Sequence, residues 1–358
     1  MKYYICERKF EDYNTKTAGV KARDDVEAIL EQEGFKAVNV WPELGDRTAM
    51  SVTDKLKMHK KMGDIWKEKL SFLKKDDVLF VQMPVVNNSF MLGAVLKKLR
   101  KKGVLVISLI HDLELLRMSS VKNIPLKQKL RMQFEEKSML AQSDVIIAHN
   151  KEMIKYLHRL GIEGSRIVSL QIFDYLADST AAAAENASQK NTFIVAGNLS
   201  PQKSAYVYKA PQSVKINLYG VNYQENDKNN LCYKGAYAPD ELISHLEGGF
   251  GLVWDGDSPD TCTGAYGEYL RFNNPHKTSL YLAAGFPVAI WKEAALAGFI
   301  ENEGAGITAS SLDSAAKLAA SVTDSEYAAL CAGARAVSEK LRSGWYLKNA
   351  IREALADI

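Results

Sequence analysis

Short runs of apolar residues recur along this chain, each followed by a stretch long enough to form a helix. Residues 77–82 (DVLFVQ) and 104–110 (VLVISLI) are apolar without alternation, which is the pattern of strands buried on both faces. Helical patterns follow both runs, at 90–101 and near 125–142. Strands that alternate with helices of about 10–15 residues form parallel βαβ units. The sequence therefore predicts an α/β protein with doubly wound, Rossmann-like sheets.

The length of 358 residues is too great for one ordinary hydrophobic core and suits two domains. Strand and helix patterns stop in a run of small and polar residues, ADSTAAAAENASQK. We expect a Rossmann-like N-terminal domain at 1–178, a linker at 179–190 and a second Rossmann-like domain at 191–344. An amphipathic helix at 345–358 is predicted to pack back on the N-terminal domain. Ligands of such sheets bind at the carboxyl ends of the strands, so the site is expected in a cleft that both domains face.

The composition excludes several classes of protein. No run approaches the roughly 20 apolar residues of a membrane-spanning helix, and the N-terminus lacks a signal-peptide pattern. The four cysteines show no CxxC spacing, so neither a disulfide framework nor a zinc site is expected. We expect a cytoplasmic protein.

The net charge of +3 is unevenly distributed along the chain. Residues 1–178 contain 31 Lys and Arg against 24 Asp and Glu, an excess of +7, and the remainder carries −4. The basic residues concentrate at 55–75 and 97–102. Such a face could bind a lipid-linked phosphate or an anionic membrane, or it could be a solvated helix surface and no more. Nucleic acid is not expected, since no binding motif or aromatic platform accompanies the basic runs.

The segment from Trp254 to Gly285 carries the strongest sign of a ligand. An apolar strand ends in a polar loop, and the loop ends at Lys277, Thr278 and Ser279 before an apolar helix. The free N–H groups and the dipole at a helix start favour an anion. Lys277 adds a charge there, and the loop supplies carboxylates and amides that could hold sugar hydroxyls. The segment therefore predicts a nucleotide-sugar site.

His111 and Asp112 end a buried strand at the expected edge of the cleft. Either side chain could remove a proton from a hydroxyl as a general base. The alternative is structural, with Asp112 capping the next helix and His111 a satisfied, half-buried side chain.

Five other residues could contact a ligand. Thr17 lies in the first strand-to-helix loop, where a simple helix cap is the competing account. Gly197 and Asn198 follow the first strand of the second domain and could admit a phosphate, or form a plain turn. Lys203 could supply a charge for a diphosphate. Tyr237 could stack on a base, although packing is the simpler reading.

A metal site is not expected from the sequence. The acidic cluster of Asp255, Asp257 and Asp260 could attract Mg²⁺, but it lacks the alternating spacing of a ligand loop. Trp254 and Trp291 end apolar strands and are expected in the core.

The sequence resembles the bacterial β-1,6-galactofuranosyltransferases of O-antigen and capsular polysaccharide assembly. More distantly it resembles the glucosyltransferases that extend glycans on streptococcal serine-rich adhesins. The matching segments follow one another along nearly the whole chain: TAGVKAR, LIHDLELLR, AHNKEMIKYL, IFDYL, AGNLS, YGVNYQ and GLVWDGDSPDTCTGAYGEYLRFNNPHKTSLYL.

This resemblance implies a GT-B fold with a UDP site in the cleft. It places Thr17 near the nucleotide from the N-terminal domain and Tyr237 on the uridine side. It implies a phosphate-binding turn and helix start made by Asn274, Pro275, His276, Lys277, Thr278, Ser279 and Leu280. The family arginine after the glycine-asparagine turn is not cleanly matched, and Lys203 is the nearest cation.

The resemblance also implies a reaction. Galactofuranose would pass from UDP-galactofuranose to a hexose hydroxyl, with inversion, and no bound metal or other cofactor is expected. Asp112 is then the preferred base and His111 the second choice, while Lys277 and the helix start stabilise the departing UDP. Three carboxylates are the candidates for holding the sugar hydroxyls: Asp255, Asp257 and Glu268.

The resemblance implies UDP-galactofuranose as donor and a glycan acceptor, which we expect to be carried on a lipid. The basic residues at 55–75 and 97–102 leave peripheral contact with the inner face of the cell membrane open, and the sequence leaves a homo-oligomer open as well. Two alternatives remain: transfer of glucose or galactopyranose from another UDP-sugar, or a UDP-sugar-binding subunit without catalysis.

Overall fold

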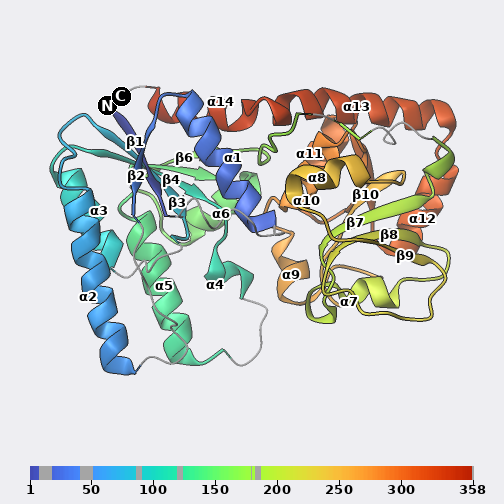
Figure 1. Ribbon diagram of the computed structural model, residues 1–358, viewed down its shortest axis with the longest axis horizontal. Helices are drawn as coiled ribbons and strands as arrows, with labels where there is room; N and C mark the ends of the chain where they lie inside the picture. Colours follow the sequence, from blue (N-terminus) through green and yellow to red (C-terminus); the bar gives the residue numbers. More distant parts are fainter. Residues whose placement is uncertain are drawn as a thin grey trace.

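The computed structural model describes residues 1–7, 18–40, 51–85, 91–118, 124–178, 180–181 and 187–356. Two six-stranded sheets, parallel throughout, form its two halves (Figure 1). The N-terminal sheet has the order β2-β1-β3-β4-β5-β6 and the C-terminal sheet the order β12-β11-β10-β7-β8-β9. In each order a non-consecutive neighbour marks a crossover connection, as doubly wound sheets require.

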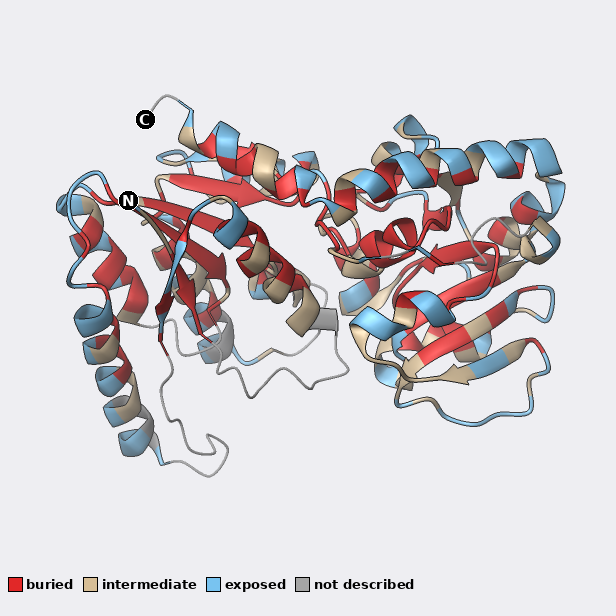
Figure 2. Cartoon of the chain, turned by 45° about the horizontal axis from the view of Figure 1, so that its top comes forward, coloured by how far each residue is buried: buried red, intermediate tan, exposed pale blue. Residues whose placement is uncertain are grey.

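The N-terminal half alternates strands and helices. Its strands are β1 (Lys2–Cys6), β2 (Lys36–Asn39), β3 (Val78–Met83), β4 (Leu105–Ile110), β5 (Val145–Ala148) and β6 (Arg166–Ser169). Its helices are α1 (Ala18–Gln32), α2 (Val52–Lys69), α3 (Leu92–Lys101), α4 (Glu114–Arg117), α5 (Leu126–Leu140) and α6 (Lys151–Arg159). Every residue of β3 and β5 is buried, which is why these strands read as continuous apolar runs (Figure 2).

The C-terminal half repeats this alternation after a short 3₁₀ helix, η3 (Ala187–Gln189). Its strands are β7 (Thr192–Asn198), β8 (Lys215–Val221), β9 (Leu231–Gly235), β10 (Phe250–Val253), β11 (Val288–Trp291) and β12 (Gly306–Ala309). Its helices are α7 (Pro201–Lys209), α8 (Pro239–His245), α9 (Gly264–Tyr269), α10 (His276–Ala283), α11 (Ala297–Asn302), α12 (Leu312–Ser321), α13 (Asp324–Arg342) and α14 (Trp345–Leu355). Trp254 and Trp291 are fully buried in this core.

The last helix returns to the N-terminal sheet. The chain leaves α13 through Gly344, whose φ of 73° is left-handed and whose added Cβ would lie 2.7 Å from Ile29 of α1. The apolar face of α14 then joins Ile107 and Leu109 of β4 in one buried cluster. Figure 1 shows α14 lying across the half that carries the N-terminus. The two halves are therefore joined by the segment after β6 and again by α14.

One local expectation is wrong. Gly197 and Asn198 do not form a turn, because they are the last residues of β7 and pair in register with Gly220 and Val221 of β8. The two strands approach closely there, since an added Cβ on Gly220 would lie 1.7 Å from the carbonyl oxygen of Gly197. Glycine at this place allows the strands to continue side by side.

Candidate active site

A cleft of about 540 Å³ lies where the strands of both sheets end. The N-terminal half contributes residues from α1, the ends of β3 and β4, α4 and the segment after β6. The C-terminal half contributes the end of β7, the first turn of α7, α9 and the start of α10. The described lining residues with chemistry to offer are Arg23, His111, Asp112, Arg117, Gly197, Asn198, Lys203, Asp255, Tyr266, Tyr269, Asn273, Asn274, Pro275, His276 and Lys277.

The charges of this lining favour an anionic ligand. Four of its described residues are cationic, namely Arg23, Arg117, Lys203 and Lys277, against the two carboxylates Asp112 and Asp255. The excess of positive charge matches a diphosphate in sign, and a concave site strengthens such attraction.

The N-terminus of α10 carries polar atoms that the protein itself does not satisfy. Pro275 precedes the helix and provides no side-chain cap. Buried polar atoms without a hydrogen bond include Asn273 Oδ1, Thr278 Oγ1 and both ring nitrogens of His276. Orphaned buried polar atoms are costly and therefore uncommon. Asn273 and His276 also line the cleft, where a polar, anionic ligand could satisfy their atoms, whereas Thr278 is not among the lining residues.

His276 is held as a neutral ring. Burial lowers its pKa to about 4, and the nearby charge of Lys21 acts in the same direction. The Asp174 backbone approaches the ring without forming a hydrogen bond of normal geometry. The ring packs 5.0 Å from that of Tyr175. A neutral imidazole keeps one N–H donor, so His276 can donate to a phosphate oxygen without carrying a charge.

Lys277 and Asp255, to which the sequence assigns different roles, form one buried ion pair. Lys277 Nζ lies 2.8 Å from Asp255 Oδ1 and 2.9 Å from the Trp254 carbonyl oxygen. Their side chains are 16% and 10% exposed. The pair ties the start of α10 to the end of β10 and places an ammonium group and a carboxylate side by side in the cleft.

Lys203 and the end of β7 also line the cleft. Lys203 Nζ lies 5.5 Å from the centre of the Tyr266 ring, next to a kink in α7 at Ser204. An added Cβ on Gly197 would meet nothing within 4 Å, so that face of the strand is open to the cleft. Asn198 Oδ1 accepts hydrogen bonds from Ser200 N at 3.0 Å and from Asn222 at 3.1 Å.

Asp112 lies at the end of β4 and does not cap α4. The N-cap of α4 is Leu113, and no side chain caps that helix. Arg117 Nη1 lies 3.6 Å from Asp112 Oδ2, and the Asp112 side chain is 41% exposed. Partial burial in the cleft raises the pKa of Asp112 above its ordinary value, against the opposing charge of Arg117. A raised pKa makes the carboxylate a better proton acceptor near neutral pH.

Tyr269 brings the C-terminal half to this carboxylate. Its hydroxyl accepts a hydrogen bond from Leu113 N at 2.9 Å and hydrogen-bonds Asp112. Tyr269 is 3% exposed and belongs to α9. The surroundings of Asp112 are therefore built by both halves.

His111 belongs to a buried polar chain. Its Nε2 lies 2.7 Å from Gln82 Oε1, and Gln82 Nε2 donates to Glu27 at 3.3 Å. The carboxylate of Glu27 can only accept, so the Gln82 amide nitrogen faces it and the oxygen faces His111. His111 therefore carries its proton on Nε2, and its ring stacks 5.2 Å from that of Phe173. This is the satisfied, half-buried histidine of the structural alternative, although it also lines the cleft.

Asn274 joins the two halves. Its backbone N–H donates to His149 Nδ1 at 2.9 Å, and its side-chain amide donates to the carbonyl oxygens of His149 and Gln171. Asn274 Oδ1 accepts from Asn150 at 2.8 Å. Burial lowers the pKa of His149 to about 4, which keeps the ring neutral and able to accept. The Asn274 side chain is thus engaged by the N-terminal half.

Several predicted residues lie outside the lining of the cleft. Tyr237 stacks on His245 at 3.9 Å and donates to the Lys234 carbonyl oxygen, which agrees with the packing alternative. Ser279 donates to the Phe173 carbonyl oxygen at 2.6 Å, and Thr278 and Leu280 are buried in α10. Glu268 pairs with Arg271. Asp257 is absent from the lining residues, and Thr17 lies outside the described residues.

The structure adds residues that the pattern of the sequence did not single out. Arg23, Arg117, Tyr266 and Tyr269 all line the cleft. Arg23 and Arg117 lie in the matching segments TAGVKAR and LIHDLELLR, so the resemblance carried a signal for them. Tyr266 and Tyr269 lie in the longest matching segment, but its pattern did not show that Tyr269 meets Leu113, a residue 156 positions away. Within the described ranges, no group of three His, Cys, Asp or Glu side chains is arranged to hold a metal ion.

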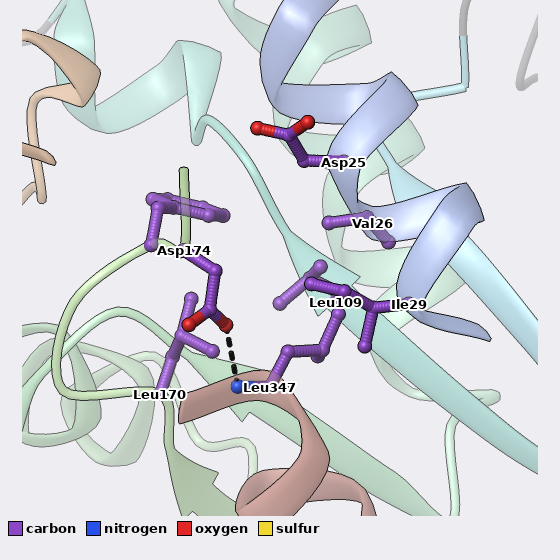
Figure 3. Close-up of a pocket in the computed structure, with 8 residues that line it drawn as sticks. Asp25, Val26, Ile29, Leu109, Leu170, Asp174 and Leu347 are labelled. Atoms are coloured by element: carbon purple, nitrogen blue, oxygen red, sulfur yellow. Dashed lines mark hydrogen bonds between the residues drawn. The ribbon is translucent and has the colours of Figure 1, made fainter. Parts of the chain in front are cut away.

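A second, closed gap lies beside the segment that crosses between the halves (Figure 3). The volume within it that a water molecule could occupy is about 0 Å³. Asp174 accepts hydrogen bonds there from Leu347 N at 2.7 Å and Tyr346 N at 3.1 Å, which caps α14. Asp25 accepts from Leu176 N at 3.1 Å. Burial raises the pKa of Asp174 to about 7 and that of Asp25 to about 6. This gap is a joint between α1, the crossing segment and α14.

Comparison with known proteins shows the family to which the chain belongs. Residues 2–172 match the glucosyltransferase 3-like N-terminal domain, and residues 193–354 match the glucosyltransferase 3-like C-terminal domain. The chain belongs to the glucosyltransferase 3-like family of glycosyltransferases.

Three curated relatives of this family member are informative. The β-1,6-galactofuranosyltransferase WbbI of Escherichia coli (strain K12) is 32% identical over 97% of both chains. Glucosyltransferase 3 of Streptococcus parasanguinis and that of Streptococcus gordonii are each 26% identical over 79% of this chain and 80% of their own.

The fold of this glucosyltransferase 3-like protein is GT-B. Sucrose-phosphate synthase from Thermosynechococcus elongatus superposes with a TM-score of 0.67 over 100% of both chains, at 12% identity. Such low identity shows the fold alone. Among the described helices, none combines the length and apolarity needed to cross a membrane.

Proposed function

We propose that this glycosyltransferase transfers galactofuranose from UDP-galactofuranose to a hexose hydroxyl, forming a β-1,6 linkage in a surface polysaccharide. The observation that carries the donor and the linkage is the 32% identity, over 97% of both chains, with a relative named β-1,6-galactofuranosyltransferase. The acceptor is proposed to be a glycan carried on a lipid, so the reaction takes place at the inner face of the cell membrane.

The donor is proposed to bind across the C-terminal half of the cleft. Its diphosphate would lie at the start of α10, where Asn273 and His276 line the cleft and have polar atoms without a hydrogen bond. Lys203 adds a positive charge on one side, and the ammonium group of Lys277, paired with Asp255, lies on the other. Asp255 is the one predicted sugar-binding carboxylate among the described residues of the lining, so we assign it to the hydroxyls of the transferred sugar.

The transfer is proposed to be one in-line displacement. The acceptor oxygen forms a bond to C1 of galactofuranose while the bond from C1 to the diphosphate oxygen breaks. The acceptor proton passes to the carboxylate of Asp112, and UDP leaves with the bonding electron pair. One displacement on an α-linked donor gives a β product. Asp112 suits the role of base by its place in the cleft and its raised pKa, with His111 the second choice.

The proposal is tested by turnover with three donors under one set of conditions. UDP-galactofuranose, UDP-galactose and UDP-glucose are each offered with an alkyl glucoside acceptor, and released UDP is measured. We expect the highest kcat/KM with UDP-galactofuranose. Preference for a pyranose donor would reject the assigned sugar and leave the assignment as a glycosyltransferase intact.

Glucosyl transfer is the second candidate. The two streptococcal relatives named glucosyltransferase 3 favour it, at lower identity and coverage than the galactofuranosyltransferase. The same assay separates the two, because a glucosyltransferase would prefer UDP-glucose. Binding of UDP without turnover of any donor would instead indicate a non-catalytic subunit.

A further inference from the structure

An apolar stripe lies on the surface of α5. Leu126, Leu130 and Phe134 are spaced four residues apart, so they advance by about 40° per step along one face of the helix. Their exposed fractions are 70%, 55% and 58%. The core-facing side chains of α5 are others, among them Met132 and Met139, which are 4% and 2% exposed. The stripe is therefore a surface feature and not part of the fold's own core.

Basic side chains surround this stripe. Lys127 and Arg131 are exposed on the same turns, and the Arg131 side chain is 63% exposed. α2 packs into the same buried cluster on the same side of the N-terminal sheet. It contains six lysines against three acidic residues. Figure 1 shows the first turns of α2 and α5 extending beyond that sheet. Apolar and basic groups thus share one end of the N-terminal half.

We propose that the basic apolar surface docks the enzyme on an anionic lipid bilayer. This surface is defined as Leu126, Lys127, Leu130 and Arg131 of α5 together with the exposed lysines of α2, which are Lys57, Lys60, Lys61, Lys67 and Lys69. Leucine side chains enter the boundary between head groups and acyl chains, and basic side chains pair with anionic head groups. The positive charge of the surface complements the negative charge of an anionic bilayer, which favours the bilayer as its binding partner. In a two-fold contact with a second copy, the same basic residues would face one another and repel.

The surface is connected to the acceptor side of the cleft. α5 packs on α4, and the half-buried carboxylate of Glu136 accepts a hydrogen bond from Leu115 N at 3.0 Å. α4 carries Arg117, which pairs with Asp112. A bilayer bound to α5 would therefore contact the half of the enzyme that we propose binds the acceptor. This proposal does not depend on which sugar the enzyme transfers.

The test is vesicle flotation with the full chain. Wild type is compared on phosphatidylcholine vesicles and on phosphatidylcholine mixed with phosphatidylglycerol. One variant combines Leu126→Ser with Leu130→Ser, and another combines Lys127→Gln with Arg131→Gln. The matched control combines Leu318→Ser with Lys317→Gln on α12, where both side chains are also exposed. Circular dichroism and UDP binding establish that every variant folds.

We expect wild type and the α12 control to float with the anionic vesicles and not with the neutral ones. Each basic residue contributes about 1 kcal/mol near such a surface, a factor of about 5, so the charge variant should bind roughly 25-fold more weakly. The leucine variant should lose binding at any salt concentration. Equal flotation of wild type and both α5 variants would overturn the proposal, as would the absence of wild-type binding. Light scattering measures the oligomeric state of the same proteins. If wild type is a dimer and the leucine variant is a monomer, the stripe binds a second copy of the chain, and the proposal is overturned.

Discussion

At the scale of single residues, Asp112 carries the proposed chemistry. Asp112→Asn preserves size and removes the proton acceptor. We expect transfer to fall by about 10²–10⁴-fold while the Kd for UDP, measured by calorimetry, stays within a factor of two or so. Wild-type turnover by the Asp112→Asn variant would remove Asp112 from the mechanism.

The pH dependence of wild type belongs to the same residue. Because the pKa of Asp112 is raised, its carboxylate takes up a proton as the pH falls through that raised value. A protonated carboxyl cannot accept the acceptor proton, so kcat/KM should decline on the acidic side of the profile. The Asp112→Asn variant should show no such acidic limb in its residual rate.

Lys203 tests the donor side with a matched control on the same helix. Lys203 lines the cleft, whereas Lys209 at the end of α7 is absent from the lining and donates to the Asp257 carbonyl oxygen. A charge-assisted contact contributes about 1.5–3 kcal/mol, so Lys203→Ala should weaken UDP binding by roughly 10- to 100-fold. Lys209→Ala should leave the Kd unchanged. Equal affinities for both variants would exclude Lys203 from the diphosphate site.

At the scale of elements, Asn150 links a helix cap to the contact between the halves. Its Oδ1 accepts from Glu152 N and Met153 N at the start of α6, and its amide nitrogen donates to Asn274. Asn150→Ala removes the cap and the contact together, and should lower the free energy of unfolding by about 2–3 kcal/mol. The control is Ser51→Ala, an exposed cap of α2, which should cost about 1 kcal/mol or less. Urea unfolding measures the loss of unfolding free energy in each variant. Equal losses would mean that the contact with Asn274 adds nothing to stability.

The joint around Asp174 makes stability depend on pH. Unfolded aspartate loses its proton near 3.8, whereas the folded pKa of Asp174 is about 7. Between these values the folded state holds a proton that the unfolded state has released. The free energy of unfolding should therefore fall as pH rises across this window, by about 1.4 kcal/mol per pH unit from this group. Asp25, with a pKa of about 6, adds to the slope in the lower part of the window.

Asp174→Asn tests that dependence. Asparagine also caps helices, so the N–H groups of Tyr346 and Leu347 keep an acceptor. The variant should show a shallower decline in stability between about pH 4 and pH 7 than wild type. Parallel curves for the two proteins would mean that Asp174 is ionised in the fold.

How far the elements could be predicted depended on their burial. β3 is buried throughout and β4 at every residue but its first, and the apolar runs at 77–82 and 104–110 predicted both. β2 buries one residue of its four, and β9 buries none fully, so neither edge strand leaves an apolar run to detect. α2 is largely polar along its first turns, so its sequence could not be distinguished from that of a loop. Edge strands and protruding helices are specified by their neighbours more than by their own sequence.

The candidate site was predictable in its location and less so in its pairings. Ten of the predicted site residues line the cleft: His111, Asp112, Gly197, Asn198, Lys203, Asp255, Asn274, Pro275, His276 and Lys277. The pairing of Lys277 with Asp255 and the engagement of Asn274 by His149 were not predictable, because their partners lie 22 and 125 residues away. Local patterns show where strands end, but they do not show which side chains meet there.

At the scale of the whole molecule, the cleft is completed by both halves. Tyr269 and Asn274 reach from the C-terminal half to the end of β4 and the start of α6, while α14 returns to the N-terminal sheet. Motion of the halves would therefore change the surroundings of Asp112 directly. This arrangement suits a transferase, since closing over the donor excludes water that would otherwise hydrolyse it.

The structure of the product tests the central claim most directly. The full chain is incubated with UDP-galactofuranose and an alkyl glucoside, and the disaccharide is analysed by NMR. We predict a β-galactofuranosyl residue on the 6-oxygen of the glucoside. An α-linked furanoside would contradict the single displacement, and the absence of any galactofuranosyl product, with turnover of UDP-glucose instead, would contradict the proposed donor.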